Sequence, residues 1–266
     1  MGSAANRPDL PSGAGRGRSM IHIVLPAFNE GRNIGRLLDR IQRAMADEDL
    51  AYRVVLVDDG SSDDTIEAAC RFGNEVPLEV VRHEKNQGLG ATLRDGLNHV
   101  IGGLDDHDIV ITMDADDSHV PGLIPRMCRR VREGHDVVIA SRFRPGARVY
   151  GVPLMRQLFS LGACFIFRLM FPTSHIRDFT CGYRAYRGSA LKRAAEHYGA
   201  GLVDIRGFQC MVDLILKLHQ LGMIIGEVPM ILRYDLKEGQ SKMRVGSTVR
   251  GTLSVLVARR FGGGSA

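Results

Sequence analysis

The feature that most restricts the fold of this chain is a series of five short apolar runs separated by amphipathic segments. The runs are rich in β-branched residues and span 21–25, 54–57, 78–81, 109–113 and 137–140. Between most of them, apolar residues repeat at helical spacing, as in Ile34, Leu37, Leu38, Ile41 and Met45. Strand–helix alternation of this kind predicts βαβ units and a mostly parallel sheet with helices on both faces.

Further elements follow from the same patterns. The residues Leu89, Leu93, Leu97 and Val100 predict a second amphipathic helix, and Ser62 is expected to cap another. Pro229 cannot donate to a central ladder, so a strand over 224–234 is expected at a sheet edge. Later helices are predicted over 154–170, 189–199, 212–221 and 248–260, the last one basic and amphipathic.

Charge is distributed unevenly along the 266 residues. Residues 20–140 carry 13 basic and 22 acidic side chains, whereas residues 141–260 carry a net charge of +12. This asymmetry favours an acidic half that holds a cation and a basic half that meets an anionic partner. Two solvated surfaces of opposite sign are the alternative interpretation.

Targeting and redox signals are weak. The longest nearly apolar run, 158–172, is interrupted by Arg168 and is shorter than the ~20 residues of a membrane-spanning helix. Residues 1–19 lack an apolar core and are expected to form a disordered tail, not a secretory signal. Five scattered cysteines predict neither a disulfide framework nor a zinc site, which fits a reducing cytosol.

Polar loops follow all five predicted strands, on the edge where parallel sheets bind ligands. Asp114 and Asp116 lie two residues apart after the fourth strand, so an extended backbone points both carboxylates the same way. Such a pair suits Mg²⁺ or Mn²⁺ that also binds a diphosphate. Asp59 is placed to accept hydrogen bonds from a ribose or base. Neither G-x-G-x-x-G nor a P-loop follows any strand, which argues against NAD binding and ATP hydrolysis.

Together these loops resemble the family 2 glycosyltransferases of the GT-A fold, and more closely their polyprenyl-phosphate (dolichol-phosphate) sugar transferases. The resemblance covers residues 20–260. Its motifs are VLPAFNE, VDDGSSDDT, NQGLGATLRDG, MDADDSH, ASRFRPGA, RDFTCGYRAYR and GQSKM. It implies a Rossmann-like, mostly parallel sheet flanked by helices, with a helical C-terminal region that faces the acceptor and the membrane. The expected parts are a nucleotide-sugar region over 20–145, an acceptor region over 146–260 and a flexible tail over 261–266.

The resemblance also implies roles for individual residues. Those expected to bind the sugar nucleotide are Pro26, Phe28, Asn29, Glu30, Val57, Asp59, Lys85, Gly88, Asp114, Ala115 and Asp116. Mg²⁺ or Mn²⁺ would be held by Asp114, Asp116 and Ser118. The acceptor phosphate would be bound by Arg142, Arg156, Arg233, Ser241 and Lys242. Asp116 and Arg142 are the expected catalytic residues.

A separate physical argument favours a phosphate acceptor. An alcohol acceptor needs a general base, whereas a phosphate is already anionic and needs cations to hold it near a diphosphate. Residues 141–187 contain eight arginines and one acidic residue, Asp178, and arginine binds phosphate in bidentate fashion. Where related enzymes read Phe-Gln-x-Glu, this chain reads Phe208-Gln209-Cys210-Met211, so a carboxylate is missing unless Asp213 replaces it.

We therefore expect an inverting, metal-dependent glycosyltransferase that moves a hexose, with mannose from GDP-mannose as the first expectation, onto a membrane polyprenyl phosphate. It would lie peripherally on the cytoplasmic face of the membrane, bind no nucleic acid, and leave room for a membrane-anchoring protein partner. One alternative is a UDP-glucose or UDP-GlcNAc transferase, with a lipid or a soluble hydroxyl or polysaccharide acceptor. Another is a non-catalytic nucleotide-binding module at the membrane. A sugar nucleotidyltransferase fits less well, because residues 26–30 lack a Gly-rich basic loop.

Overall fold

A computed structural model describes residues 19–73, 75–152, 162, 176–205 and 207–238. Its main feature is a seven-stranded sheet in the order β3-β2-β1-β4-β7-β5-β8. All pairings are parallel except those of β7 with β4 and β5. The strands are β1 (Ile21–Ala27), β2 (Tyr52–Asp58), β3 (Leu78–Arg82), β4 (Ile109–Thr112), β5 (Val137–Ser141), β7 (Arg184–Arg187) and β8 (Ile225–Pro229). The five predicted strands and the mostly parallel sheet are confirmed.

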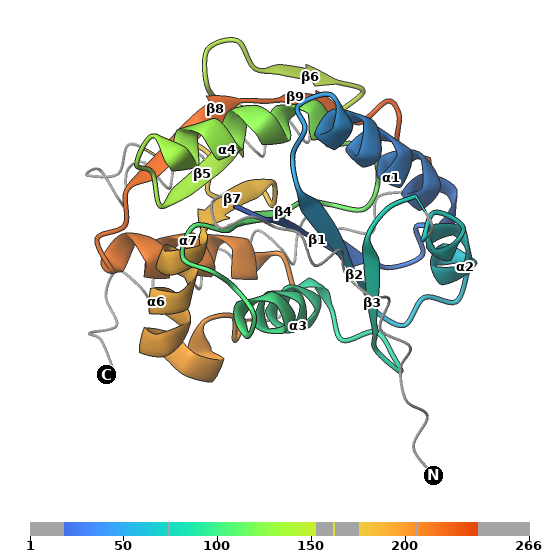
Figure 1. Cartoon of the computed structure of the whole chain (residues 1–266), viewed down its shortest axis with the longest axis horizontal. Helices are drawn as coiled ribbons and strands as arrows, with labels where there is room; N and C mark the ends of the chain where they lie inside the picture. Colours follow the sequence, from blue (N-terminus) through green and yellow to red (C-terminus); the bar gives the residue numbers. More distant parts are fainter. Residues whose placement is uncertain (1–18, 74, 153–161, 163–175, 206, 239–266) are drawn as a thin grey trace.

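Helices cover both faces of this sheet (Figure 1). One layer contains α1 (Gly31–Ala46), α2 (Thr65–Cys70) and α4 (Ile124–Arg132), which follows the short 3₁₀ turn η1 (Pro121–Leu123). The opposite layer contains α3 (Leu89–Ile101), α6 (Gly188–Tyr198) and α7 (Gln209–Gln220), with a second 3₁₀ turn, η2 (Gly199–Gly201), after α6. The helices predicted over 189–199 and 212–221 correspond to α6 and α7.

The core lies between the sheet and these two layers. Residues Val54–Val57 of β2 are fully buried, as expected for a strand covered on both faces. Gly96 allows α3 to approach the sheet closely, because a Cβ at this position would lie 2.6 Å from Val24 Cγ1 and 2.9 Å from Val57 Cγ2. The apolar faces read from the sequence are therefore the faces that pack.

The strand β7 was not predicted. It is short and its sequence, RAYR, includes two arginines, yet Arg184 is fully buried and its Nη2 donates to the Phe179 carbonyl at 2.8 Å. The strand enters between β4 and β5 in the antiparallel direction. No local pattern announces such an insertion, because the pairing partners of β7 lie far away in the sequence.

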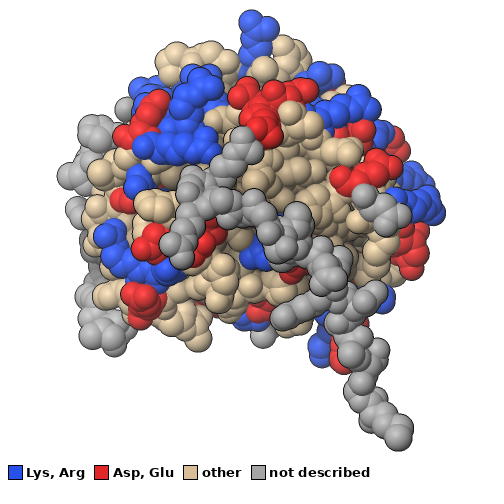
Figure 2. Space-filling view, viewed as in Figure 1, with Lys and Arg blue, Asp and Glu red and all other residues tan. Residues whose placement is uncertain are grey.

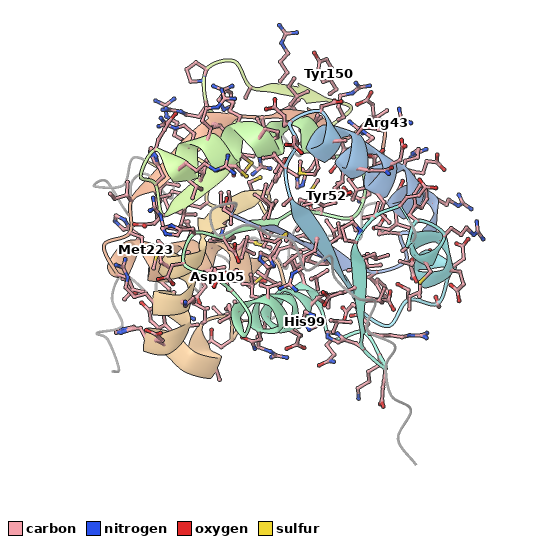
Figure 3. All side chains as sticks on the ribbon, viewed as in Figure 1. Arg43, Tyr52, His99, Asp105, Tyr150 and Met223 are labelled. Atoms are coloured by element: carbon pink, nitrogen blue, oxygen red, sulfur yellow. The ribbon has the colours of Figure 1, made fainter. Side chains whose placement is uncertain are left out.

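A small second sheet pairs β6 (Arg148–Tyr150) with β9 (Ile231–Arg233). The predicted strand over 224–234 is thus two strands: β8 is the edge strand of the large sheet, as expected, and β9 leaves it after Met230. In Figure 3, Tyr150 of β6 and His99 of α3 lie at opposite ends of the view, with the large sheet between them.

The predicted helix cap at Ser62 is wrong. Helix α2 begins at Thr65, with Asp64 at the N-cap position. The Ser62 backbone N–H instead donates to Asn29 Oδ1 at 2.8 Å, so this serine joins two loops. The predicted tails over 1–19 (except Ser19) and 261–266, and the helices over 154–170 (except Gly162) and 248–260, lie outside the described residues.

Charged side chains of both signs lie on the face of the molecule shown in Figure 2. Figure 2 shows acidic and basic side chains interspersed over the visible face, with a dense basic area over α4. Among the residues that the structure describes, no helix is long and apolar enough to cross a membrane.

Candidate active site

The loops predicted to bind the donor meet at the carboxyl edge of the sheet. Parallel pairing sets Ala27 of β1 beside Asp58 of β2, and the Asp59 N–H donates to the Ala27 carbonyl at 2.8 Å. The Met113 N–H donates to the Val24 carbonyl, which brings the end of β4 to the same place. Residues from three strands, far apart in the sequence, therefore line one edge.

The first loop, which contains Pro26, Phe28, Asn29 and Glu30, is tied to the loop after β2. Asn29 has a left-handed φ of 53°, and its backbone N–H donates to Ser61 Oγ at 2.8 Å. The Glu30 N–H donates to Thr65 Oγ1 at 2.8 Å. Pro26 and Phe28 are half-buried, and Pro26 is the register partner of Val57.

Asp59 organises the loop that follows β3. Its Oδ1 accepts hydrogen bonds from His83 Nδ1 and the Gln87 N–H, and its Oδ2 accepts one from the Gly88 N–H, all at 2.8 Å. Gly60 has a φ of 71°, and a Cβ there would lie 2.7 Å from the Lys85 backbone. The predicted donor residues Asp59, Lys85 and Gly88 thus belong to one connected structure.

An open space adjoins this loop. A cavity of about 410 Å³ lies between the segment 85–94 and residues 203–205, and Lys85 and Arg94 contribute cationic side chains to its lining. This cavity is on the side of the loop that faces the chain preceding α7.

The two aspartates after β4 occupy different environments. The Asp114 side chain is 40 % exposed, whereas that of Asp116 is 12 % exposed. Asp116 Oδ1 accepts hydrogen bonds from the Ser118 N–H at 3.1 Å and from Ser118 Oγ at 2.6 Å. Ala115 between them is buried. Asp114 therefore offers an accessible carboxylate, whereas Asp116 is more buried and is hydrogen-bonded within its loop.

Asp116 also contacts a residue that the sequence did not indicate. Lys237 Nζ donates to Asp116 Oδ2 at 2.6 Å. Burial disfavours ionisation of Asp116, but Lys237 and the hydrogen bond from Ser118 outweigh it, so the pKa of Asp116 lies below its ordinary value. Lys237 and Asp116 are far apart in the sequence, so no local motif links them.

His119 is a second residue that sequence reasoning missed. Its Nδ1 accepts a hydrogen bond from the Asp114 N–H at 3.2 Å, which leaves the ring proton on Nε2, 3.9 Å from Asp114 Oδ2. The ring stacks on Tyr183 with centroids 5.1 Å apart. Its place five residues after Asp114 in the same loop was the available signal.

Arg142 forms a buried ion pair beside these aspartates. Its Nε and Nη2 donate to the two oxygens of Asp178 at 2.8 and 2.7 Å, and Nη2 also donates to Thr180 Oγ1. Against the effect of burial, Arg142 lowers the pKa of Asp178. Arg142 also acts electrostatically on Asp114. Its Nη1 makes no hydrogen bond to the described residues and is free to bind an anion.

The remaining predicted phosphate ligands are less informative. The Arg233 N–H donates to the Ser118 carbonyl at 2.8 Å, but its guanidinium pairs with Asp235 and lies over the Tyr150 ring. Arg156, Ser241 and Lys242 lie outside the described residues.

Asp213, the residue that could replace the missing carboxylate, pairs with a lysine of its own helix. It is buried in α7, and its Oδ2 lies 2.5 Å from Lys217 Nζ, one helical turn later. Lys217 also contacts Asp204 and the Gly201 carbonyl. Asp213 is thus committed to an internal ion pair.

The donor set suits a hard divalent cation. Within the described ranges, no three His, Cys, Asp or Glu side chains gather as a complete metal-binding group. Mg²⁺ commonly binds to one or two carboxylates and completes its coordination with water and phosphate oxygens. The carboxylates of Asp114 and Asp116 fit such a shared site.

Several known proteins have sequences related to this chain. The model of the family described as "Glycosyl transferase family 2" matches residues 22–194. An undecaprenyl-phosphate mannosyltransferase from Micrococcus luteus is 32% identical, with 84% of this chain and 87% of that protein aligned. A polyprenol monophosphomannose synthase from Mycolicibacterium smegmatis is 31% identical, over 86% and 82% of the two chains.

A dolichol-phosphate mannosyltransferase from Pyrococcus furiosus is 30% identical over 86% of this chain, which spans 60% of that protein's length. Among solved structures, glucosyl-3-phosphoglycerate synthase from Mycobacterium tuberculosis, in complex with Mn²⁺, UDP and its product, superimposes with a TM-score of 0.67 at 22% identity. That alignment covers 94% of this chain and 82% of the other, and it confirms the GT-A-type fold. This chain belongs to glycosyl transferase family 2.

Proposed function

We propose that this protein transfers mannose from GDP-mannose to the phosphate of a membrane polyprenyl phosphate, with Mg²⁺ or Mn²⁺ bound at Asp114 and Asp116. The observation that carries the proposal is the arrangement of the Arg142 guanidinium: Nε and Nη2 are held by Asp178 and Thr180, whereas Nη1 makes no hydrogen bond to the described residues. A cation at this position suits an anionic acceptor beside a bound diphosphate. Three relatives support the choice of substrates: a dolichol-phosphate mannosyltransferase, an undecaprenyl-phosphate mannosyltransferase and a polyprenol monophosphomannose synthase.

The chain's own residues divide the work. The loops that contain Glu30, Asp59 and Gly88 hold the nucleotide, and Arg142 orients the acceptor phosphate for in-line attack on the anomeric carbon. A phosphate oxygen needs no general base, which agrees with the internal ion pair of Asp213. A bound Mg²⁺ or Mn²⁺ supplies charge stabilisation for the departing diphosphate.

The acceptor is a membrane lipid, so we include the membrane surface as a partner and place the protein peripherally on its cytoplasmic face. The basic area over α4 supports this placement, because cationic side chains are attracted to an anionic leaflet. A separate membrane-anchoring protein would be compatible with the same arrangement.

The test is transfer of radiolabelled mannose from GDP-mannose to polyprenyl phosphate in detergent with Mn²⁺, followed by extraction with organic solvent. We expect label in the organic phase. Label that stays wholly in the aqueous phase overturns the lipid acceptor and favours a soluble hydroxyl acceptor. Lipid labelling from UDP-glucose or UDP-GlcNAc alone changes the donor and keeps the acceptor. Donor binding without release of nucleoside diphosphate indicates a binding module.

A further inference from the structure

An ion pair between Lys237 and Asp116 joins the segment after β9 to the loop after β4. Lys237 Nζ lies 2.6 Å from Asp116 Oδ2, and the two side chains are only 10 % and 12 % exposed. Ser118 donates twice to the other oxygen, Oδ1. Both oxygens of this carboxylate therefore already have partners.

The two partners differ in how easily they leave. Ser118 is in the same loop as Asp116, and its hydroxyl oxygen keeps lone pairs after donating its proton. Lys237 comes from a separate segment after β9, and an ammonium has no lone pair to offer a metal ion. A divalent cation and the Lys237 ammonium are hence mutually exclusive partners of Oδ2, since two cations would repel at this distance.

The segment that carries Lys237, residues 234–238, is fastened to the start of α1. The Glu238 N–H donates to Asn33 Oδ1, and Asn33 Nδ2 donates to the Glu238 carbonyl, both at 3.1 Å. Arg36 Nη2 donates to the Leu236 carbonyl at 2.9 Å, and the Arg36 guanidinium also pairs with the Glu238 carboxylate.

Asn33 connects this segment to the donor loop as well. The same Asn33 Nδ2 donates to Glu30 Oε2 at 2.7 Å, and Glu30 is one of the residues predicted to bind the nucleotide. The segment 234–238 thus bridges the loop after β1 and the loop after β4, between which the nucleotide diphosphate would lie.

We propose that Lys237 is the internal counter-ion of the metal site, and that the segment 234–238 is a strap which releases Asp116 when a divalent cation and the nucleotide diphosphate arrive together. This proposal rests on the proposed function, because it takes Asp116 as a metal ligand. The diphosphate makes the exchange favourable: it brings oxygen ligands for the metal and negative charge for the displaced ammonium. Binding of the metal alone has to break the Lys237–Asp116 pair without that compensation.

The deciding measurement is the affinity of the donor-free protein for Mn²⁺. It is obtained from the electron paramagnetic resonance signal of free Mn²⁺ during a titration. Lys237→Met removes the competing charge and keeps the side-chain length, so Mn²⁺ binding should tighten at least about fivefold, the lower end of ordinary coupling between sites. Lys237→Arg keeps the charge and should stay within about twofold of the wild-type protein. Equal or weaker Mn²⁺ binding by Lys237→Met overturns the proposal.

Lys192→Met is the matched control. Lys192 Nζ also lies 2.6 Å from an aspartate, Asp106, but Lys192 belongs to α6 and the pair is outside the site. Its loss should leave Mn²⁺ binding unchanged. A fivefold gain in this variant as well would assign the effect to overall charge and overturn the proposal.

Two further readouts separate the failure modes. Asp116→Asn should abolish Mn²⁺ binding; if binding persists unchanged, the metal assignment of the proposed function fails, and the strap fails with it. If Asp116→Asn abolishes binding but Lys237→Met does not tighten it, only the strap fails.

Hydrogen exchange gives a test without any variant: backbone amides of 234–238 should lose protection when Mn²⁺ and GDP are added together. Retained protection at saturation contradicts the release of the strap.

Discussion

The two edges of the central sheet use the same kinds of charged side chain in opposite ways. At the amino edge, Arg53 Nε donates to His22 Nδ1 at 2.7 Å, so His22 Nε2 carries the proton and donates to Asp108 Oδ2. Asp108 also accepts hydrogen bonds from the Met20 and Asp105 N–H groups. The hydrogen bonds form a continuous chain from Arg53 through His22 to Asp108, and this network holds three strand starts together.

The carboxyl edge is different, because its charged groups keep binding capacity. The Asp114 carboxylate is accessible, Arg142 Nη1 makes no hydrogen bond to the described protein, and Asp116 is paired with a cation from another segment. A closed network stabilises a fold, whereas an open one can exchange partners with a ligand. The comparison predicts that changes at the carboxyl edge mainly reduce transfer and that changes at the amino edge mainly reduce stability.

The largest effect is expected for Asp116→Asn. Loss of one carboxylate charge from the metal site should lower the transfer rate at least about 10³-fold, as expected when several kcal/mol of charge stabilisation are removed. Transfer is measured with radiolabelled donor, and thermal unfolding serves as the control for an intact fold. Turnover near the wild-type level would show that the Asp116 carboxylate is not needed for transfer, which contradicts the predicted difference between the two edges.

Arg142→Lys should lower transfer about 100-fold, or about 2.7 kcal/mol. The planar guanidinium of Arg142 binds both oxygens of Asp178 and still has N–H groups for a phosphate. A lysine ammonium cannot make both sets of contacts at once. The deficit should appear with the polyprenyl-phosphate acceptor, while the dissociation constant for GDP-mannose stays within about threefold. A selective loss of donor affinity would instead assign Arg142 to the nucleotide.

Asp59→Asn should weaken donor binding about tenfold, which corresponds to about 1.4 kcal/mol. In the wild-type protein the Gln87 and Gly88 N–H groups donate to the two carboxylate oxygens of Asp59. An asparagine has only one acceptor oxygen, and its NH₂ group would face one of these donors, so the loop would lose a hydrogen bond. Isothermal titration of GDP-mannose with Mn²⁺ gives the affinity. Unchanged affinity would show that this loop is not needed for the donor.

The smallest effect concerns the amino edge and pH. Burial and Arg53 hold the pKa of His22 below its ordinary value of 6.5, against the influence of Asp108. Below pH 6.5, His22 becomes protonated in the unfolded chain, while in the folded chain it is still neutral. Acidification therefore favours unfolding, and the stability contribution of neutral His22 is lost as pH falls below 6.5. The loss is at most about 1.4 kcal/mol per pH unit.

Urea unfolding at pH 7.5, 6.5 and 5.5 checks this, with His22→Gln as the reference. Glutamine can accept from Arg53 and donate to Asp108 without titrating. The wild-type protein should lose more stability on acidification than the variant, and transfer at pH 7.5 should differ little between the two. Parallel stability profiles would show that His22 is not the titrating group.

The sequence was informative wherever structure depends on near neighbours. Apolar runs predicted five strands because parallel strands covered on both faces must be continuously apolar, and Ile34 to Met45 predicted α1 because its buried face repeats each turn. Loops at the strand ends followed directly from that arrangement, which is why Asp59 and Asp114 could be placed at one edge.

What the sequence missed depends on distant partners. Strand β7 gains its place from hydrogen bonds to β4 and β5, and Lys237 gains its place from Asp116, with no repeating pattern in either case. His119 was overlooked because it has no second histidine at ligand spacing; its role comes from the Asp114 backbone and the Tyr183 ring. Ser62 looked like a helix cap because the competing acceptor, Asn29, lies on another loop.

The antiparallel direction of β7 has a consequence for how such enzymes can diversify. Since β5 and β7 are neighbours that run in opposite directions, the chain leaves β5 after Ser141 and enters β7 at Arg184 on the same side of the sheet, with the stretch 142–183 between them. Its length and content can change without altering any strand that supports the nucleotide loops. The part of the chain that contains Arg142, which we propose to bind the acceptor phosphate, can therefore vary while the strands of the nucleotide site stay the same.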